Sequence, residues 1–277
     1  RALLAQLEED LAQAAVLVHA GGHVALGAGD AEVRREGGAG QHQRHGGAEG
    51  ALADLERPGS FEDAITRKRR EAELLLWAPD YDGGNKALVR FRDDGTWEVV
   101  NHHLVMRDRE RTGREASPTA AVIDSQSVKT TESGGPRGYD AGKKVKGRKR
   151  HLLVDTLGLL LLVWMTTADV QDRDVAQALL PWASQEYPEL GKAWMDGGYQ
   201  GEPVKKAGAD NGIEVHIIKR ADQDKGFVLL PRRWIVERTF GWLNRERRLS
   251  KDYERQEESS EAFIHLSMVR LMIRRLA

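Results

Sequence analysis

Residues 150–166 read Arg150-His-Leu-Leu-Val-Asp155, Thr156-Leu-Gly158 and Leu159-Leu-Leu-Leu-Val-Trp-Met-Thr166. Two apolar runs separated by a short segment that contains glycine are typical of a β-hairpin. We expect its first strand, residues 150–155, to be a core strand.

Shorter elements surround this hairpin. The apolar runs at residues 119–123, 192–196 and 213–219 predict three further strands. Capping residues and apolar spacing predict helices over residues 97–111, 172–187, 203–209, 231–249 and 258–276. The order strand, hairpin, helix, strand, helix, strand, helix predicts an α/β fold in which helices cover the faces of a mixed sheet.

Three acidic residues stand next to predicted core elements. Asp124 ends the first apolar strand, and Asp196 ends the strand Lys192-Ala-Trp-Met-Asp196 just before Gly197-Gly-Tyr199. Glu237 lies in a predicted helix that is rich in arginine. If the two strands are neighbours, the aspartates converge at one edge of the sheet and the helix adds the glutamate. Carboxylate oxygens are preferred ligands of Mg²⁺, and two such ions can drive phosphoryl transfer.

Each acid also has an ordinary structural explanation. An aspartate after a strand often begins a turn, and a glutamate in a helix usually faces water. Arg233 and Glu237 are four residues apart, so they can pair on the helix surface whether or not they serve a site.

A basic cluster, Lys143-Lys-Val-Lys-Gly-Arg-Lys-Arg-His151, is predicted to lie in the loop that enters the hairpin. Together with arginines of the glutamate helix, it can neutralise phosphates without reading sequence. A targeting signal or a solubilising loop is the alternative, although the cluster directly adjoins a core strand. We expect Trp234 and Trp242 to be core residues rather than base-stacking platforms. The residues expected to contact DNA are Lys143, Lys144, Lys146, Arg148, Lys149, Arg150, Arg233 and Arg238.

The formal net charge of −1 conceals a difference between two parts of the chain. Residues 118–277 hold 26 Lys and Arg against 22 Asp and Glu, and residues 1–117 hold 16 against 21. A mildly basic second part is compatible with nucleic acid without requiring it. The absence of cysteine excludes disulfides and thiol chemistry and is typical of a cytoplasmic protein. No apolar run approaches the roughly 20 residues of a membrane span, so no membrane partner is expected.

The segments described so far, read together, resemble the DDE transposases of bacterial insertion sequences, in the IS-five-like group with an RNase H-like catalytic domain. The match covers roughly residues 91–277. It is carried by residues 121–132, by Gly135-Pro-Arg-Gly-Tyr-Asp140 and the following residues to Gly158, by Asp196-Gly-Gly-Tyr199, by Leu230-Pro-Arg-Arg-Trp-Ile-Val-Glu-Arg-Thr-Phe240 and by Arg248-Leu-Ser-Lys-Asp-Tyr-Glu-Arg255.

The resemblance implies that Asp124, Asp196 and Glu237 form a catalytic triad that binds Mg²⁺ or Mn²⁺. It implies cleavage at the terminal inverted repeats and strand transfer into target DNA by a homodimer or a larger synaptic assembly. Relatives often carry a Tyr-Arg-Glu-Lys signature around the glutamate. Leu230 and Asn244 stand at its tyrosine and lysine positions, so those two roles do not transfer to this chain.

The front of the chain departs from this family. Residues 1–60 contain no Phe, Trp or Tyr, and ten glycines fall between Gly21 and Gly50. We therefore expect an atypical, low-complexity region over residues 1–75, with a helix at most over 2–18, and hypothesise that it is frameshifted. The chain begins at Arg1 rather than methionine, from which we expect a truncated or conceptually translated start. Residues 76–117 are expected to be a helical remnant of a DNA-binding region with its linker, and 118–277 the catalytic domain.

Two alternative functions remain open. A catalytically inactive remnant would keep the basic DNA-binding surface without chemistry. A plain RNase H-like nuclease would cut DNA without joining its ends.

Overall fold

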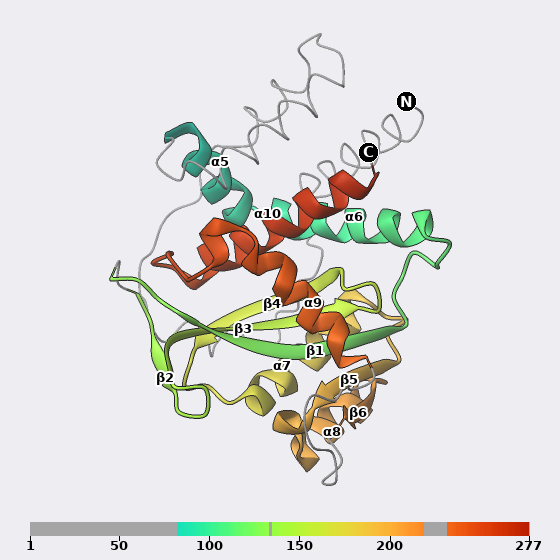
Figure 1. Ribbon diagram of the computed structural model, residues 1–277. Coiled ribbons are helices and arrows are strands. Elements are labelled where there is room, and N and C mark those ends of the chain that lie inside the picture. The colour runs from blue at the N-terminus through green and yellow to red at the C-terminus, as the bar shows by residue number, and fades with distance from the viewer. Residues whose placement is uncertain (1–81, 133–134, 219–231, 277) are drawn as a thin grey trace. The chain divides into compact units, whose positions relative to one another are not determined.

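The computed structural model describes residues 82–132, 135–218 and 232–276 (Figure 1). The low-complexity region expected over residues 1–75 lies outside these ranges. No helix in the described ranges is long and apolar enough to cross a membrane.

One mixed sheet forms the centre of the described structure. The third strand in the chain pairs antiparallel with the first strand along one edge and with the second and fourth strands along its other edge. The first strand also pairs parallel with the fifth strand, and the fifth pairs parallel with the sixth. Four strands joined by antiparallel pairing, extended by two parallel ones beyond the first strand, form a mixed sheet, and the predicted α/β class is confirmed. The strands are β1 (Ala120–Lys129), β2 (Gly138–Asp140), β3 (Val145–Asp155), β4 (Leu160–Thr167), β5 (Lys192–Asp196) and β6 (Glu214–Ile218).

Helices cover both faces of this sheet (Figure 1). Helices α6, α9 and α10 lie on one face, and α7 lies on the other with α8 beside it. Helix α5 packs on α6 and α10. The helices are α5 (Asp82–Asp93), α6 (Thr96–Arg111), α7 (Asp172–Glu186), α8 (Glu202–Asp210), α9 (Arg233–Asn244) and α10 (Glu257–Leu276), with short 3₁₀ turns η1 (Gly197–Tyr199) and η2 (Arg247–Leu249).

The predicted hairpin of residues 150–166 is present as the β3–β4 pair. The buried carboxylate of Asp155 shapes its turn, because Oδ1 accepts hydrogen bonds from the amides of Leu157 (2.9 Å) and Leu159 (2.8 Å). Gly158 adopts a positive φ of 79°, and a Cβ there would lie 2.8 Å from the Thr239 hydroxyl of α9. The turn therefore needs glycine both for its backbone and for the close approach of α9.

Several boundaries differ from the prediction. The first strand was predicted to end before Asp124, yet β1 continues to Lys129 because β3 supplies hydrogen-bonding partners from Ala121 to Lys129. The basic cluster was predicted in a loop, yet residues 145–150 belong to β3. The helix predicted over residues 231–249 ends at Asn244 and is followed by η2. Strand β2 was not predicted, and α5 lies within residues 76–117, which were expected to be helical without bounds for a helix at this place.

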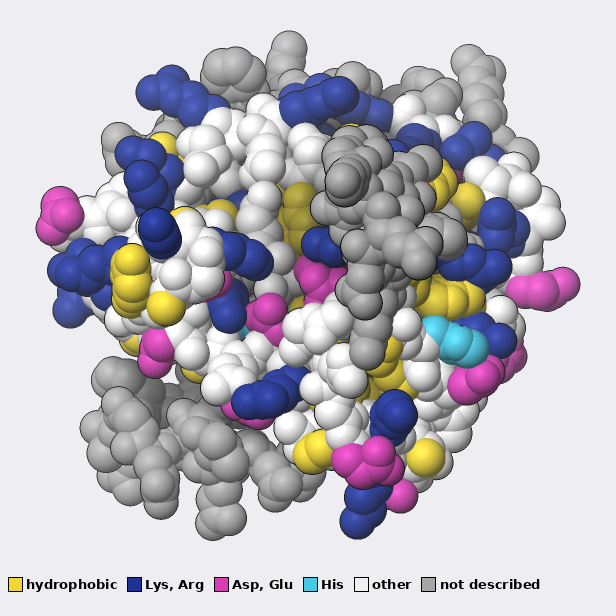
Figure 2. Space-filling view, turned by 60° about the horizontal axis from the view of Figure 1, so that its bottom comes forward, with side chains coloured by type: hydrophobic (Ala, Val, Ile, Leu, Met, Phe, Trp, Pro, Cys, Tyr) yellow, Lys and Arg dark blue, Asp and Glu magenta, His cyan; other side chains and the backbone are white. Residues whose placement is uncertain are grey.

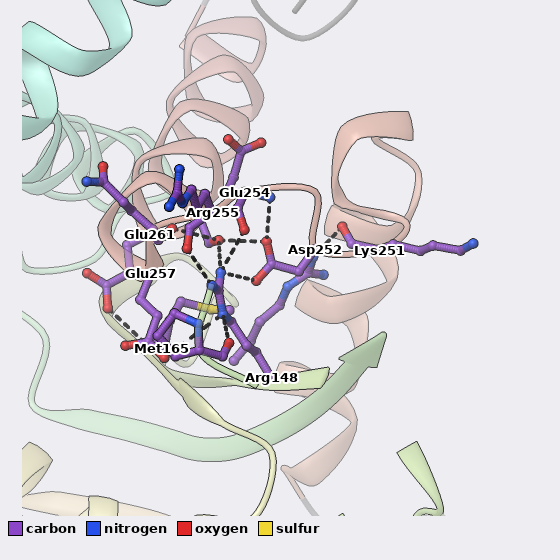
Figure 3. Close-up of polar contacts among 12 residues, drawn as sticks. Arg148, Met165, Lys251, Asp252, Glu254, Arg255, Glu257 and Glu261 are labelled. Atoms are coloured by element: carbon purple, nitrogen blue, oxygen red, sulfur yellow. Dashed lines mark hydrogen bonds and ion pairs between the residues drawn. The ribbon is translucent and has the colours of Figure 1, made fainter. Parts of the chain in front are cut away.

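A buried ion pair ties β3 to the segment between η2 and α10 (Figure 3). The side chain of Arg148 is fully buried, and its Nη1 donates to Asp252 Oδ2 at 3.0 Å. Its other nitrogens donate to the backbone oxygens of Pro136 and Arg255, both at 2.8 Å. The second oxygen of Asp252 accepts from the Ser260 hydroxyl of α10 at 2.8 Å. A buried charge must be paired in this way, so Arg148 holds the sheet and the C-terminal segment together.

Asp252→Asn is expected to lower the free energy of unfolding by about 3 kcal/mol, because it leaves the buried Arg148 guanidinium without its counter-charge while keeping the side-chain volume. Urea unfolding curves would measure the change. The exposed neighbour Lys251→Ala is the matched control and is expected to stay within about 0.5 kcal/mol of the unmodified protein. Equal stabilities for Asp252→Asn and the control would show that the pair contributes nothing.

Candidate active site

The three predicted acids gather around one guanidinium. Because β1 and β5 are parallel neighbours, Asp124 and Asp196 lie on adjacent strands, and α9 brings Glu237 to the same place. Arg233, one turn before Glu237, has its Nε 3.9 Å from Asp124 Oδ2 and 3.3 Å from Glu237 Oε1. Its Nη2 lies 3.5 Å from Asp196 Oδ2. The structure thus brings together four side chains from three elements.

Backbone amides orient both aspartates in the same manner. The amide of Ser125 donates to Asp124 Oδ1 at 2.7 Å, and the amide of Gly198 donates to Asp196 Oδ1 at 2.8 Å. In each carboxylate the other oxygen, Oδ2, faces Arg233. Main-chain donors therefore fix the acids before any ligand arrives, which is how preorganised sites are built.

The site carries more negative charge than Arg233 offsets. Burial, and after it the nearby Asp196, raise the pKa of Asp124 from 3.8 to about 6, against the opposing effects of the Ser125 amide, Arg233 and Lys143. The Nε of Arg233 is buried and makes no hydrogen bond of ordinary geometry. This nitrogen therefore interacts with Asp124 and Glu237 through charge attraction rather than through a hydrogen bond of ordinary geometry.

These residues suit a divalent cation by their chemistry. In the described part of the chain, no three His, Asp or Glu side chains lie close enough together to hold a metal ion. The free oxygens of Asp124, Asp196 and Glu237 nevertheless converge on the place that the Arg233 guanidinium takes. Carboxylate oxygens are the ligands that Mg²⁺ and Mn²⁺ prefer, and the excess negative charge would be balanced by such an ion.

A second polar layer lies behind the acids, and its members were not predicted. From the sequence, Asp172 or Asp174 was expected to cap α7, but Oδ1 of the Asp172 carboxylate accepts from the Ser125 hydroxyl at 2.9 Å and pairs with Lys149 Nζ at 3.1 Å. Tyr199 is buried beside this layer, and burial together with Asp124, Asp172 and Asp196 raises its pKa. Only the sequence Gly197-Gly-Tyr199 directly after Asp196 could have drawn attention to it.

The predicted DNA-contacting residues fall into two groups. Lys143, Lys144 and Lys146 are exposed, and Lys143 Nζ donates to the Ser125 backbone oxygen at 3.1 Å. Figure 2 shows acidic side chains near the middle of one face with Lys and Arg side chains around them.

The second group is buried, which speaks against the expectation that its members contact phosphate. Arg148, Lys149 and Arg150 are 0%, 7% and 1% exposed. Arg148 is held by Asp252, Lys149 Nζ donates to the Val170 oxygen at 2.7 Å, and Arg150 Nη2 donates to the Lys251 oxygen at 3.3 Å. Their location in β3 rather than in a loop is the physical reason.

Arg238 is also engaged within the protein. Its Nη2 donates to the Leu157 backbone oxygen at 2.7 Å, and its guanidinium stacks between the rings of Trp234 and Trp242 at 4.6 and 4.8 Å. These contacts join α9 to the β3–β4 turn and speak against a DNA contact by Arg238. Trp234 was predicted to be a core residue, but it is 40% exposed.

Comparisons with known proteins agree with these observations. A family model described as "Transposase DDE domain" matches residues 115–272. A Burkholderia cepacia protein described as "Putative transposase for insertion sequence element IS402" is 34% identical over 155 residues, which cover 52% of this chain and 70% of that protein. The solved structure "Crystal structure of the Mos1 mariner paired end complex with Mn" is 12% identical and aligns with 90% of this chain and 82% of its own, but its TM-score of 0.31 is too low to bear on the fold.

Asp124→Asn is expected to stabilise the protein at pH 7 and not at pH 4. The folded-state pKa of about 6 exceeds the ordinary value of 3.8, so the folded protein binds a proton that the unfolded chain releases between these values. The unmodified protein therefore loses stability as the pH rises from about 4 to about 6, by up to about 3 kcal/mol. Asparagine does not ionise and avoids this loss.

Urea unfolding at both pH values in EDTA would measure the effect, with the exposed Asp174→Asn as the matched control. If Asp124→Asn gains no stability over the unmodified protein at pH 7 relative to pH 4, the pKa of Asp124 is not raised in the folded protein.

Proposed function

The chain belongs to the transposase DDE domain family, and from that premise we propose that it cuts DNA at the ends of an insertion sequence and joins the freed ends to target DNA. The observation that carries this proposal is the convergence of Asp124, Asp196 and Glu237 on the Arg233 guanidinium. Residues 118–277 are the proposed catalytic domain, which agrees with the family match over residues 115–272.

The three acids are the proposed catalytic residues and ligands for Mg²⁺ or Mn²⁺. A bound ion would supply the charge that activates an attacking oxygen and stabilises the leaving one. The Ser125 and Gly198 amides hold the two aspartates so that their free oxygens point into the site. This orientation lowers the cost of bringing the reacting groups into line.

Arg233 is the proposed contact to the scissile phosphate. It offsets part of the charge of the three acids in the protein without ligands, and a cation in the site would release it from that role. An arginine guanidinium binds phosphate through two parallel hydrogen bonds, which suits it to orient the strand that is cut.

Lys143, Lys144 and Lys146 are the proposed contacts to the DNA backbone, and the proposed DNA partners are the terminal inverted repeats and the target. Synapsis of two ends requires at least a dimer, so a homodimer or a larger assembly is proposed. Phosphate contacts of this kind position a duplex without selecting its sequence.

Asp124→Asn, Asp196→Asn and Glu237→Gln are each expected to lower cleavage and strand transfer at least about 100-fold, because each removes an electrostatic group that supports the transition state. The measurement is strand transfer by the purified full chain with its own element ends and Mg²⁺. Glu258→Gln, an exposed glutamate at the start of α10, is the matched control.

The same assay separates the alternative functions. Cleavage without joining would identify a nuclease, and DNA binding without chemistry in Mg²⁺ or Mn²⁺ would identify an inactive remnant. Activity that persists in Asp124→Asn would remove the catalytic assignment.

Divalent cations are expected to raise the melting temperature of the unmodified protein and not of Asp196→Asn. Binding to the folded state alone stabilises it by about 2.7 kcal/mol at a concentration 100 times the dissociation constant. Thermal unfolding with Mn²⁺ added to metal-free protein would measure the shift independently of activity, and Glu258→Gln again serves as control. A shift of the same size in Asp196→Asn would place the cation elsewhere.

A further inference from the structure

Residues 137–147 form a small hairpin with an exposed aromatic ring, which we call the hairpin arm. It consists of β2, a four-residue turn and the first residues of β3. Tyr139 on β2 is 55% exposed and is the most exposed of the large hydrophobic side chains in the described ranges. The proposed chemistry at the acids leaves this ring without a role.

The two faces of the hairpin arm differ sharply. Tyr139 pairs with Lys146 across the ribbon, and both side chains are exposed. The next pair places Asp140 on the opposite face, where it is buried and accepts from the Ser127 hydroxyl at 2.6 Å. Because side chains alternate along a strand, one face of the arm is anchored on the protein and the other faces solvent.

Two paired glycines hold the base of the arm in place. A Cβ on Gly138 would lie 1.6 Å from Asp169 Oδ1, and a Cβ on Gly147 would lie 1.9 Å from the Val128 oxygen. The backbone therefore approaches its neighbours more closely than any other residue would allow. An arm fixed in this way loses little conformational entropy when it binds a partner.

The exposed side of the arm is basic and adjoins the acids. Arg137, Lys144 and Lys146 accompany Tyr139, while Asp140 is the only acidic residue of the arm and is turned inward. Lys143 in the turn reaches the backbone oxygen of Ser125, the residue after Asp124. A DNA strand that ends at the acids would thus pass close to the arm.

Lysines on an edge strand also have a plain explanation, because they discourage pairing with another sheet. That explanation does not account for an exposed tyrosine, which increases the risk of association. An aromatic ring beside lysines is instead the combination that single-stranded nucleic acid uses, since bases stack on the ring while cations contact the phosphates.

We propose that the hairpin arm binds an unpaired DNA strand next to the cleavage site, with Tyr139 stacking on a base and Lys144 and Lys146 contacting phosphates. Stacking requires an unpaired base, because the faces of paired bases are covered inside a duplex. This inference rests on the proposed function, since it assumes that the acids act on DNA.

The test uses the full chain with Glu237→Gln, so that DNA is bound and not cut. Fluorescence anisotropy compares an element-end duplex carrying a short 3′ single-stranded extension with the same duplex made blunt. Tyr139→Ala is expected to weaken binding of the extended DNA at least about 5-fold and to change binding of the blunt DNA little. Tyr139→Phe keeps the ring and is expected to bind as before.

Three further measurements sharpen the test. Quenching of 2-aminopurine in the extension is expected with Tyr139 or Phe and not with Ala at this position. Lys144→Ala and Lys146→Ala are each expected to reduce the slope of log affinity against log salt by about 0.7 to 0.9. Val89→Ala and Lys205→Ala, exposed residues on α5 and α8, are the matched controls.

If Tyr139→Ala binds the extended DNA with unchanged affinity, the proposal that the arm is a stacking site is wrong, even if the unmodified chain transposes. A chain that shows the stacking signal but neither cuts nor joins DNA would overturn the proposed function and leave the arm. An equal loss on blunt and extended DNA would also reject the preference for an unpaired strand.

Discussion

Strand β1 is paired along both edges, and the site depends on this constraint. Its antiparallel pairing with β3 runs from Ala121 to Lys129, and its parallel pairing with β5 covers Ala120 to Val122. The double pairing aligns β1 with β5 just before Asp124, so that Asp124 and Asp196 come to lie on adjacent strands. Two carboxylates that would repel each other in water are thereby held close together. The repulsion between these carboxylates lowers the stability of the folded protein, as is common where a site needs charges in an unfavourable arrangement.

Arg233 relieves this repulsion only in part. One guanidinium faces three carboxylates at distances between 3.3 and 3.9 Å, longer than a well-formed charged hydrogen bond. The three acids therefore keep a net negative charge in the protein without ligands. The proposed cation would offset this charge, and Arg233 would then be available for the proposed contact to phosphate.

Much of this arrangement could be predicted from the sequence. The apolar runs of residues 150–166 and 192–196 identified β3, β4 and β5 because apolar residues in short runs bounded by turn residues have few other uses. The extension of β1 past Asp124 could not be predicted, since Ser125, Gln126 and Ser127 lack an apolar pattern and form a strand only because β3 lies beside them. The contacts of Asp172 could not be predicted either. The sequence offered this residue only as a candidate cap of its helix, whereas its partners Ser125 and Lys149 come from two strands of the sheet.

In the basic cluster, neighbouring charged side chains have different partners because they point to opposite faces of a strand. In β3 the side chains alternate, so Arg148 and Arg150 face the segment around Asp252 while Lys149 faces Asp140 and Asp172. The partner of Arg148 lies 104 residues away, a distance at which no local pattern carries information. Before Gly147 the side chains of Lys143, Lys144 and Lys146 are exposed, although Lys143 still reaches the Ser125 backbone oxygen. The boundary between buried and exposed charge in this cluster therefore falls at Gly147, where the close approach of the Val128 oxygen excludes any side chain.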